Sequence, residues 1–229
     1  MITSPNNDSL TQVRKLAGRK WRDKLGEFVA EGEDLLEAAD EAGWAPVLRL
    51  CAAGSGLPGE EVAPPLLAKV SQLGSGTRAL AIYPQRWAAG PAGPLCVALW
   101  GVNDPGNVGT VIRSALAFGA GSVALGPGTA DPYGAKAVRA SMGALFSVPL
   151  ARVRDPGELP GRRVGLAARE GRPLAELGPG EVTLVVGAER EGLPDAVLAA
   201  CDEVCHIPIH SESLNAAMAA TVAMYEVSR

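Results

Sequence analysis

The sequence predicts an α/β protein in two domains, the second built around a mostly parallel β-sheet flanked by helices. From residue 95 onward, short apolar runs alternate with segments of helical periodicity. Strands that are buried on both faces read as continuous apolar runs, and their alternation with helices indicates βα units in a parallel sheet. The expected strands are residues 95–100, 122–125, 145–148, 164–168, 182–186 and 204–209.

A smaller α/β unit precedes this region. Its expected helices are residues 33–42 and 66–73, and its expected strands are residues 47–52 and 79–83. The stretch that follows, RWAAGPAGP at residues 86–94, has the composition of a linker. We therefore expect an N-terminal domain of residues 1–88, a linker at residues 89–94 and a larger domain at residues 95–229.

The composition argues against several classes of protein. No apolar run approaches the roughly 18 residues that span a bilayer, and the first ten residues lack the apolar core of a secretory leader. The four cysteines are too few and too scattered for a disulfide scaffold. These features predict a cytoplasmic protein with reduced cysteines, which are Cys51, Cys96, Cys201 and Cys205.

One short stretch near the N-terminus is strongly basic, although the whole chain carries a formal net charge of −4. That net charge argues against a protein that coats nucleic acid through bulk electrostatics. A local basic run is either the solvated face of a helix or a patch that contacts RNA phosphates. The cations in this stretch are Arg14, Lys15, Arg19, Lys20, Arg22 and Lys24.

The loop after the first apolar run of the larger domain leads into an amphipathic helix. Residues 103–119 read NDPGNVGTVIRSALAFG, and a helical projection places Asn107 and Arg113 together on the polar side. An arginine there can fork onto a phosphate, and a helix start offers free N–H groups to an anion. Taken alone, the segment also fits an ordinary surface helix.

Two further loops follow later apolar runs. Residues 187–194 read GAEREGLP, where glycines at both ends allow a ligand close to the backbone and Glu189 is placed to accept hydrogen bonds from a ligand or from Arg113. Residues 207–215 read IPIHSESLN and lead into an alanine-rich helix. Ser213 is either a site residue or the N-cap of that helix. Ligands of parallel sheets bind beyond the C-terminal strand ends, where all three loops are expected.

The order and placement of the three motifs, with RASMG at residues 139–143 between them, resemble the SpoU/TrmH group of the SPOUT superfamily, a group of RNA ribose methyltransferases. This resemblance implies a sheet whose C-terminal segment forms a trefoil knot, a homodimer that pairs through the knotted domain, and S-adenosylmethionine as cofactor. The implied cofactor residues are Gly187, Ala188, Ile207, Ile209 and Leu214. The implied catalytic residues are Asn107, Arg113, Glu189, Ser213 and Asn215, and no metal is implied.

The N-terminal half resembles the substrate-binding domain often attached in this group, which is similar in fold to a ribosomal RNA-binding protein. The match is carried by a G-x-F-x-x-E-G pattern at Gly26, Phe28, Glu31 and Gly32. Given this resemblance, we expect the basic stretch to contact RNA phosphates, because affinity for RNA depends on neutralising phosphate charge.

The resemblance implies methyl transfer from S-adenosylmethionine to a ribose 2′-hydroxyl, with large-subunit (23S) ribosomal RNA favoured as substrate. Two alternatives are transfer RNA as the substrate and a non-catalytic knotted RNA-binding or assembly protein. The second draws on a departure from the family pattern, since only His210, Ser211 and Glu212 separate Ile209 from Ser213. A zinc site at Cys201, Cys205, His206 and His210 is disfavoured because successive strand residues face opposite ways. A nicotinamide-dependent enzyme is disfavoured because no G-x-G-x-x-G follows the first strand.

Overall fold

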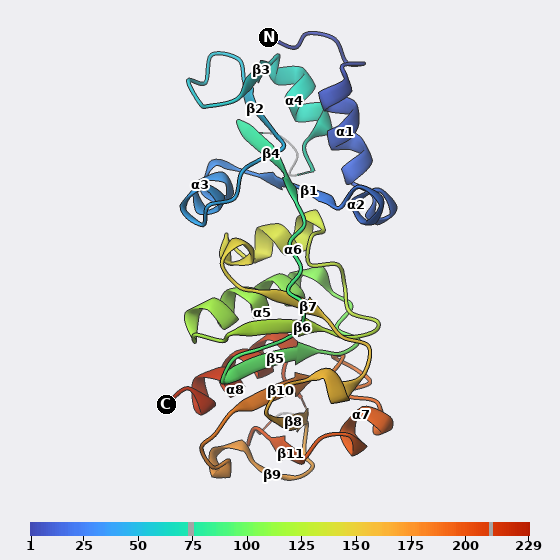
Figure 1. The fold of residues 1–229 in the computed structure, drawn as a ribbon, viewed down its shortest axis with the longest axis vertical. Helices are drawn as coiled ribbons and strands as arrows, with labels where there is room; N and C mark the ends of the chain where they lie inside the picture. Colours follow the sequence, from blue (N-terminus) through green and yellow to red (C-terminus); the bar gives the residue numbers. More distant parts are fainter. Residues whose placement is uncertain (73–75, 211–212) are drawn as a thin grey trace. The chain divides into compact units, whose positions relative to one another are not determined.

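The computed structural model describes residues 1–72, 76–210 and 213–229, so Leu73 of the expected helix 66–73, and Ser211 and Glu212 of the short loop, lie outside the described residues (Figure 1). Contacts divide the chain into two compact units. The first comprises Met1–Gln85 and Asp131–Phe146, and the second comprises Arg86–Ala130 and Ser147–Arg229. The first unit thus contains a segment that the sequence analysis assigned to the larger domain.

The first unit is a four-stranded sheet in the order β1-β4-β2-β3, covered by helices. β4 pairs antiparallel with both β1 and β2, and β3 pairs parallel with β2. The apolar faces of α1 and α4 pack into a core that includes Leu10, Leu67 and Leu80. The strands are β1 (Glu27–Glu31), β2 (Leu48–Ala52), β3 (Glu60–Val62) and β4 (Ala79–Pro84). The helices are α1 (Asp8–Leu16), α2 (Arg19–Leu25), α3 (Glu33–Glu41), α4 (Pro64–Val70), α6 (Ala135–Ala140) and the 3₁₀ turn η1 (Ala144–Phe146).

A cluster of aromatic rings holds the segment Asp131–Phe146 in the first unit. The centroid of Phe28 lies 4.7 Å from that of Tyr133 and 6.1 Å from that of Phe146. The indole N–H of Trp44 donates to the carbonyl oxygen of Phe146 at 2.8 Å. Because buried aromatic pairs contribute beyond their apolar area, this cluster explains why the segment belongs to the first unit.

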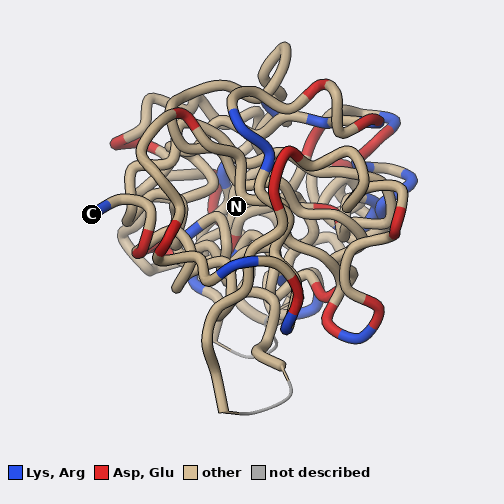
Figure 2. The backbone as a smooth tube through the Cα atoms, turned by 90° about the horizontal axis from the view of Figure 1, so that it is seen from below, with Lys and Arg blue, Asp and Glu red and all other residues tan. Residues whose placement is uncertain are grey.

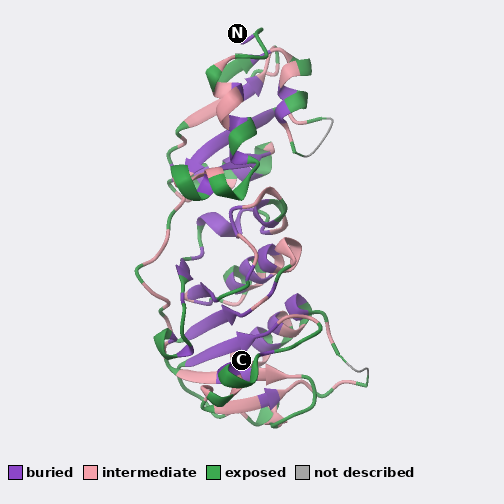
Figure 3. Ribbon diagram, turned by 90° about the vertical axis from the view of Figure 1, so that its right-hand side faces the viewer, coloured by how far each residue is buried: buried purple, intermediate pink, exposed green. Residues whose placement is uncertain are grey.

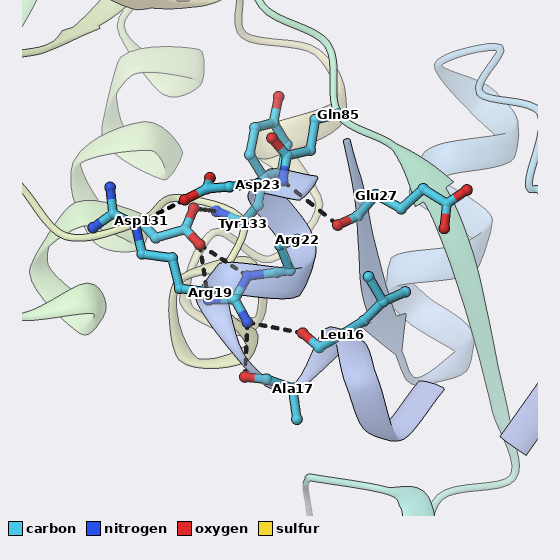
Figure 4. A network of polar contacts seen from close by, with 9 residues as sticks. All are labelled: Leu16, Ala17, Arg19, Arg22, Asp23, Glu27, Gln85, Asp131 and Tyr133. Carbon is cyan, nitrogen blue, oxygen red and sulfur yellow. Dashed lines mark hydrogen bonds and ion pairs between the residues drawn. The ribbon is translucent and has the colours of Figure 1, made fainter. Parts of the chain in front are cut away.

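A buried arginine reinforces the same arrangement (Figure 4). Only 7% of Arg22 is exposed, and its Nε and Nη2 each lie 2.8 Å from Oδ2 of Asp131. Its Nη1 donates to the carbonyl oxygens of Leu16 and Ala17, both at 2.8 Å, at the end of α1. These carbonyls have no partner within the helix, so Arg22 satisfies them. The structure therefore differs from the expectation at Arg22, whose guanidinium is used by the fold and is withheld from RNA phosphates.

The second unit is a seven-stranded sheet in the order β7-β6-β5-β10-β8-β11-β9, in which every pairing is parallel. The predicted parallel α/β architecture is confirmed here, and Figure 3 shows the burial of its central strands. The strands are β5 (Leu95–Leu99), β6 (Ser122–Leu125), β7 (Leu150–Arg152), β8 (Arg162–Ala167), β9 (Arg172–Pro173), β10 (Val182–Val186) and β11 (Glu203–His206). The helices are α5 (Pro105–Ala117), α7 (Asp195–Ala199) and α8 (Ala216–Val227), with 3₁₀ turns η2 (Pro156–Glu158) and η3 (Leu174–Glu176).

Two expected strands need correction. The expected strand at residues 145–148 is wrong, because Ala144–Phe146 forms a 3₁₀ turn in the first unit and the strand begins at Leu150. The apolar run reflects burial of Leu145 and Phe146 among aromatic neighbours rather than strand pairing. The expected strand 204–209 is shorter than predicted, since β11 ends at His206.

A forked ion pair fixes the start of β8 against the turn before β11. The carboxylate of Asp202 accepts from Nε and Nη2 of Arg163 at 3.0 and 2.8 Å, and from its backbone N–H at 2.8 Å. These hydrogen bonds lower the pKa of Asp202 to about 2. The pair therefore holds the register of two strands whose other ends lead to the site.

Charged residues are interspersed along the chain, as Figure 2 shows. Within the ranges described, none of the helices is both long enough and apolar enough to cross a membrane.

Replacing Arg22 with alanine is expected to lower the free energy of unfolding by about 3–5 kcal/mol, because the largely buried side chain of Asp131 would lose its cationic partner. The matched control is Arg19→Ala on the same helix, where the ion pair with Asp23 is exposed and the expected loss is under about 1 kcal/mol. Urea unfolding followed by circular dichroism measures both. Equal losses for the two variants would contradict the structural role of Arg22.

Candidate active site

The second unit contains a cavity of about 750 Å³ at the C-terminal ends of β8, β10 and β11. This volume lies within the range typical of small-molecule and cofactor sites, and the position is where parallel sheets bind ligands. Its walls come from the ends of the three strands, the turn before α7 and the start of α8. The lining residues include Leu166, Ala167, Val186, Gly187, Ala188, Leu193, Leu198, Ile207, Ile209, Leu214, Ala216 and Ala219.

A closed turn after β10 forms one wall of this cavity. The backbones of Ala188 and Gly192 exchange hydrogen bonds of 3.1 and 3.0 Å, so residues 189–191 lie at the tip of the turn. A Cβ added at Gly187 would overlap the backbone of Gly192 and Leu193. Glycine is therefore required at position 187 for the chain to double back this closely.

All five residues expected to hold the cofactor line this one cavity. The turn contributes Gly187 and Ala188, and the segment after β11 contributes Ile207 and Ile209. Leu214 completes the set just before α8. The cavity thus combines close backbone approach with an apolar lining, a surface suited to the flat apolar face and polar edge of a nucleoside.

Hydrogen bonds join three of the five expected catalytic residues. Nδ2 of Asn107 donates to Oε1 of Glu189, and Nδ2 of Asn215 donates to Oδ1 of Asn107 at 3.1 Å. Asn107 lies in the first turn of α5, Glu189 in the turn after β10 and Asn215 at the start of α8, and Glu189 also lines the cavity. The predicted partner of Glu189 was a ligand or Arg113, whereas the structure gives it the amide of Asn107. We call Asn107, Glu189 and Asn215 the polar cluster.

Helix capping positions two members of the polar cluster. Oδ1 of Asp104 accepts from the N–H groups of Gly106 and Asn107 at 2.6 and 3.1 Å, which fixes the start of α5. Oδ1 of Asn215 accepts from the N–H groups of Ala217 and Met218, so Asn215 is the N-cap of α8. The N-cap role considered for Ser213 therefore belongs to Asn215, and Ser213 lines the cavity instead.

Arg113 lies apart from the polar cluster. It follows Asn107 by six positions on α5, about 9 Å along a helix axis, and its side chain is exposed. Arg113 forms no hydrogen bond or ion pair with any other described residue, that is, within 1–72, 76–210 and 213–229. Its neighbour Ser114 is 2.7 Å from the hydroxyl oxygen of Thr221 on α8, which holds the two helices together. The guanidinium is thus available to an external anion.

One wall of the cavity was not predicted. The end of β8 and the loop after it contribute Leu166, Arg169 and Glu170, and the first residue of α7 contributes Asp195. The parallel sheet explains the contribution of β8: because β8 is the neighbour of β10, the C-terminal ends of both strands lie at the same edge. The loop carries no motif, so only the strand order identifies it.

The cysteines near this region are packing residues. Burial raises the pKa of the thiols of Cys201 and Cys205, which keeps both protonated at neutral pH. Across the described part of the chain, no three His, Cys, Asp or Glu side chains are grouped as a metal site requires.

Comparison of the chain with known proteins identifies its family. Residues 94–225 match the model of the SpoU rRNA Methylase family. The chain is 32% identical to the 23S rRNA (guanosine(2553)-2′-O)-methyltransferase RlmP of Bacillus subtilis, over 99% of this chain and 98% of that protein. The family resemblance described from the motifs is thereby confirmed.

Solved structures agree over nearly the whole chain. The SpoU methyltransferase AviRb from Streptomyces viridochromogenes, in complex with the cofactor AdoMet, has a TM-score of 0.88 at 30% identity, covering 98% of each chain. The AdoMet-bound rRNA methyltransferase from Sinorhizobium meliloti has a TM-score of 0.88 at 28% identity, covering 99% of this chain and 96% of that one. The similarity therefore includes both compact units.

Gly187→Ala is expected to weaken binding of S-adenosylmethionine by about tenfold or more, a change of about 1.4 kcal/mol, because the added methyl displaces the turn that walls the cavity. Isothermal titration calorimetry measures the change. Gly178→Ala is the matched control, since a Cβ there meets nothing within 4 Å. Unchanged affinity in Gly187→Ala would mean that the cofactor does not lie against this turn.

Proposed function

Because this chain belongs to the SpoU rRNA methylase family, we propose that it transfers a methyl group from S-adenosylmethionine to a ribose 2′-hydroxyl of large-subunit ribosomal RNA. The observation that carries the proposal is the position of Glu189, which lines the cavity and accepts a hydrogen bond from Asn107 in the polar cluster. The proposed cofactor site and the proposed catalytic site therefore share a residue.

The cavity residues fit the cofactor by their chemistry. Gly187 and Ala188 offer backbone groups to the polar edge of an adenine, while Ile207, Ile209 and Leu214 offer apolar contacts to its faces. S-adenosylmethionine supplies an electrophilic methyl group. The protein must then hold the ribose hydroxyl in line with that methyl and manage the proton that the hydroxyl loses.

Arg113 is the proposed contact to the reacting nucleotide. A guanidinium stays protonated at neutral pH and does not act as a free base. In this proposal Arg113 grips the phosphate next to the target ribose and stabilises the developing alkoxide, and the proton leaves through phosphate or water. Asn107, Glu189, Ser213 and Asn215 keep the surrounding loops in position.

Ribosomal RNA is favoured over transfer RNA by the extent of the similarity. The Bacillus subtilis relative, named for a 23S rRNA position, matches 99% of this chain, so the first unit is included. That unit exposes five cations of the basic stretch, since Arg22 alone is buried. Phosphate contacts by exposed Arg and Lys supply much of the affinity for RNA. The proposed RNA contacts are Arg14, Lys15, Arg19, Lys20 and Lys24.

Three further features expected from the family belong to the same proposal: the trefoil knot, a cytoplasmic location and a homodimer. The dimer is supported by an apolar stripe on α8, where Met218, Val222 and Tyr225 are 54%, 41% and 51% exposed. Their spacing places them on one side of the helix. Contiguous exposed apolar side chains of this kind mark an interface, and a second copy of the chain is the proposed partner.

Arg113→Ala is expected to reduce transfer of labelled methyl from S-adenosylmethionine to 23S rRNA by about 100-fold or more, because a lost transition-state contact costs that much. Arg113→Lys is expected to reduce methyl transfer nearly as much, since the ammonium group of lysine lacks the planar pair of donors of a guanidinium. Arg154→Ala, an exposed arginine of the same unit, is the control and should retain full activity. Near-normal turnover by Arg113→Lys would contradict the role proposed for the guanidinium.

The substrates in this assay are purified ribosomal RNA and bulk transfer RNA, and alkaline resistance maps the methylated ribose. Label in transfer RNA alone would favour the alternative substrate. Absence of label in both, together with absence of cofactor binding, would favour the non-catalytic RNA-binding alternative.

Val222→Asp is expected to convert the dimer to a monomer, because a buried unpaired carboxylate costs several kcal/mol. Light scattering coupled to size-exclusion chromatography measures the mass. Val47→Asp replaces a valine that is 55% exposed in the first unit and should leave the mass unchanged. A dimeric Val222→Asp protein would exclude this stripe as the interface.

A further inference from the structure

The helix α2 has an unusual distribution of side chains in the first unit. Its only buried residue is Arg22, while its tryptophan, Trp21, is left half-buried at the surface. Leu25 on the same helix is 42% exposed. The helix therefore buries a charged side chain and leaves its aromatic ring only partly buried.

Two lysines accompany the ring of Trp21. Nζ of Lys15 lies 5.2 Å from the ring centroid, and Nζ of Lys24 lies 5.1 Å from it. Both distances are within the range of cation–π attraction. Lys15 comes from the last turn of α1 and Lys24 from the last turn of α2. The ring is thus the centre of a small cationic surface contributed by two helices.

The helix that carries Trp21 is held in place by contacts within the protein. A helix of seven residues is unstable by itself, yet α2 is held by the four contacts of the adjacent Arg22 to Asp131, Leu16 and Ala17. Figure 4 shows this network from close by. A ring carried on a helix anchored in this way loses less conformational entropy on binding than one carried on a free segment.

We propose that Trp21 is a stacking platform for an unpaired RNA base, and that Lys15 and Lys24, which lie over the ring in the free protein, move off it to contact the phosphates on either side of that base. Single-stranded RNA is recognised by stacking of splayed bases on aromatic rings beside cationic side chains. A base inside a duplex has both faces occupied by its neighbours and cannot stack on Trp21. The inference rests on the proposed function, and it specifies a single-stranded segment as the part of the RNA that the first unit binds.

The test uses the full-length protein and a single-stranded RNA 12-mer that carries one 2-aminopurine, whose fluorescence falls when it stacks on an aromatic ring. Trp21→Leu keeps an apolar side chain and removes the stacking face. It is expected to weaken binding of the 12-mer by about tenfold or more and to abolish the fluorescence quenching. Leu25→Ala, at the exposed apolar neighbour on α2, is the matched control and should bind and quench as the wild type does.

A duplex of the same length separates stacking from charge. Trp21→Leu should bind the duplex as tightly as the wild type, whereas Lys20→Ala should weaken both RNAs. If Trp21→Leu binds and quenches the single strand as the wild type does, while Lys20→Ala binds RNA more weakly, the stacking platform is wrong. The basic surface of the proposed function would then still stand. If neither substitution changed RNA binding, both the platform and that surface would be wrong, and the methyl-transfer assay would still test the enzyme independently.

A second measurement needs no variant and so does not depend on whether Trp21→Leu folds. A 12-mer with 5-bromouridine in place of 2-aminopurine is photo-crosslinked to the wild-type protein, and the modified peptide is located by mass spectrometry. Crosslinking at Trp21 is the expected result. Crosslinks confined to other positions of α1 and α2 would overturn the proposal.

Discussion

The parallel pairing of β10 with both of its neighbours is the constraint on which the site depends. Val182 lies opposite Leu95 of β5 and Arg162 of β8, and all five residues of β10 are buried. Because parallel strands end at the same edge of a sheet, the loops after β5, β8 and β10 converge there without long connections. The cavity and the polar cluster are consequences of this register, and a slip by one residue would turn every β10 side chain to the other face.

Burial of Arg22 has a comparable effect on the first unit. A buried charge is tolerated only when it is paired and hydrogen-bonded, and Asp131 with the two α1 carbonyls meets both conditions. The same contacts fix Asp131–Phe146 to the unit and orient α2. The surface that α2 presents, with Trp21 and Lys24, is thus determined by which of its side chains is inside.

Sequence patterns predicted most of the second unit because its strands are continuous apolar runs, and the resemblance to the SpoU/TrmH group implied that Asn107, Glu189 and Asn215 belong to one site. The errors have physical causes. The run at residues 145–148 is apolar because Phe146 packs in an aromatic cluster, and burial alone does not distinguish a strand from a 3₁₀ turn. Arg22 looked like its basic neighbours because its partner, Asp131, is distant in sequence. The loop after β8 has no motif, so its contribution to the cavity depended on the strand order.

The separation of Arg113 from the polar cluster suggests how the proposed site would be kept from transferring methyl groups in the absence of RNA. The cluster is already formed by hydrogen bonds within the protein, whereas Arg113 has no such partner among the residues described. In the proposed reaction, a phosphate of the substrate therefore supplies the contact that orients the guanidinium. Water and free nucleosides lack that phosphate, so they cannot complete the arrangement in which a hydroxyl is activated beside the cofactor.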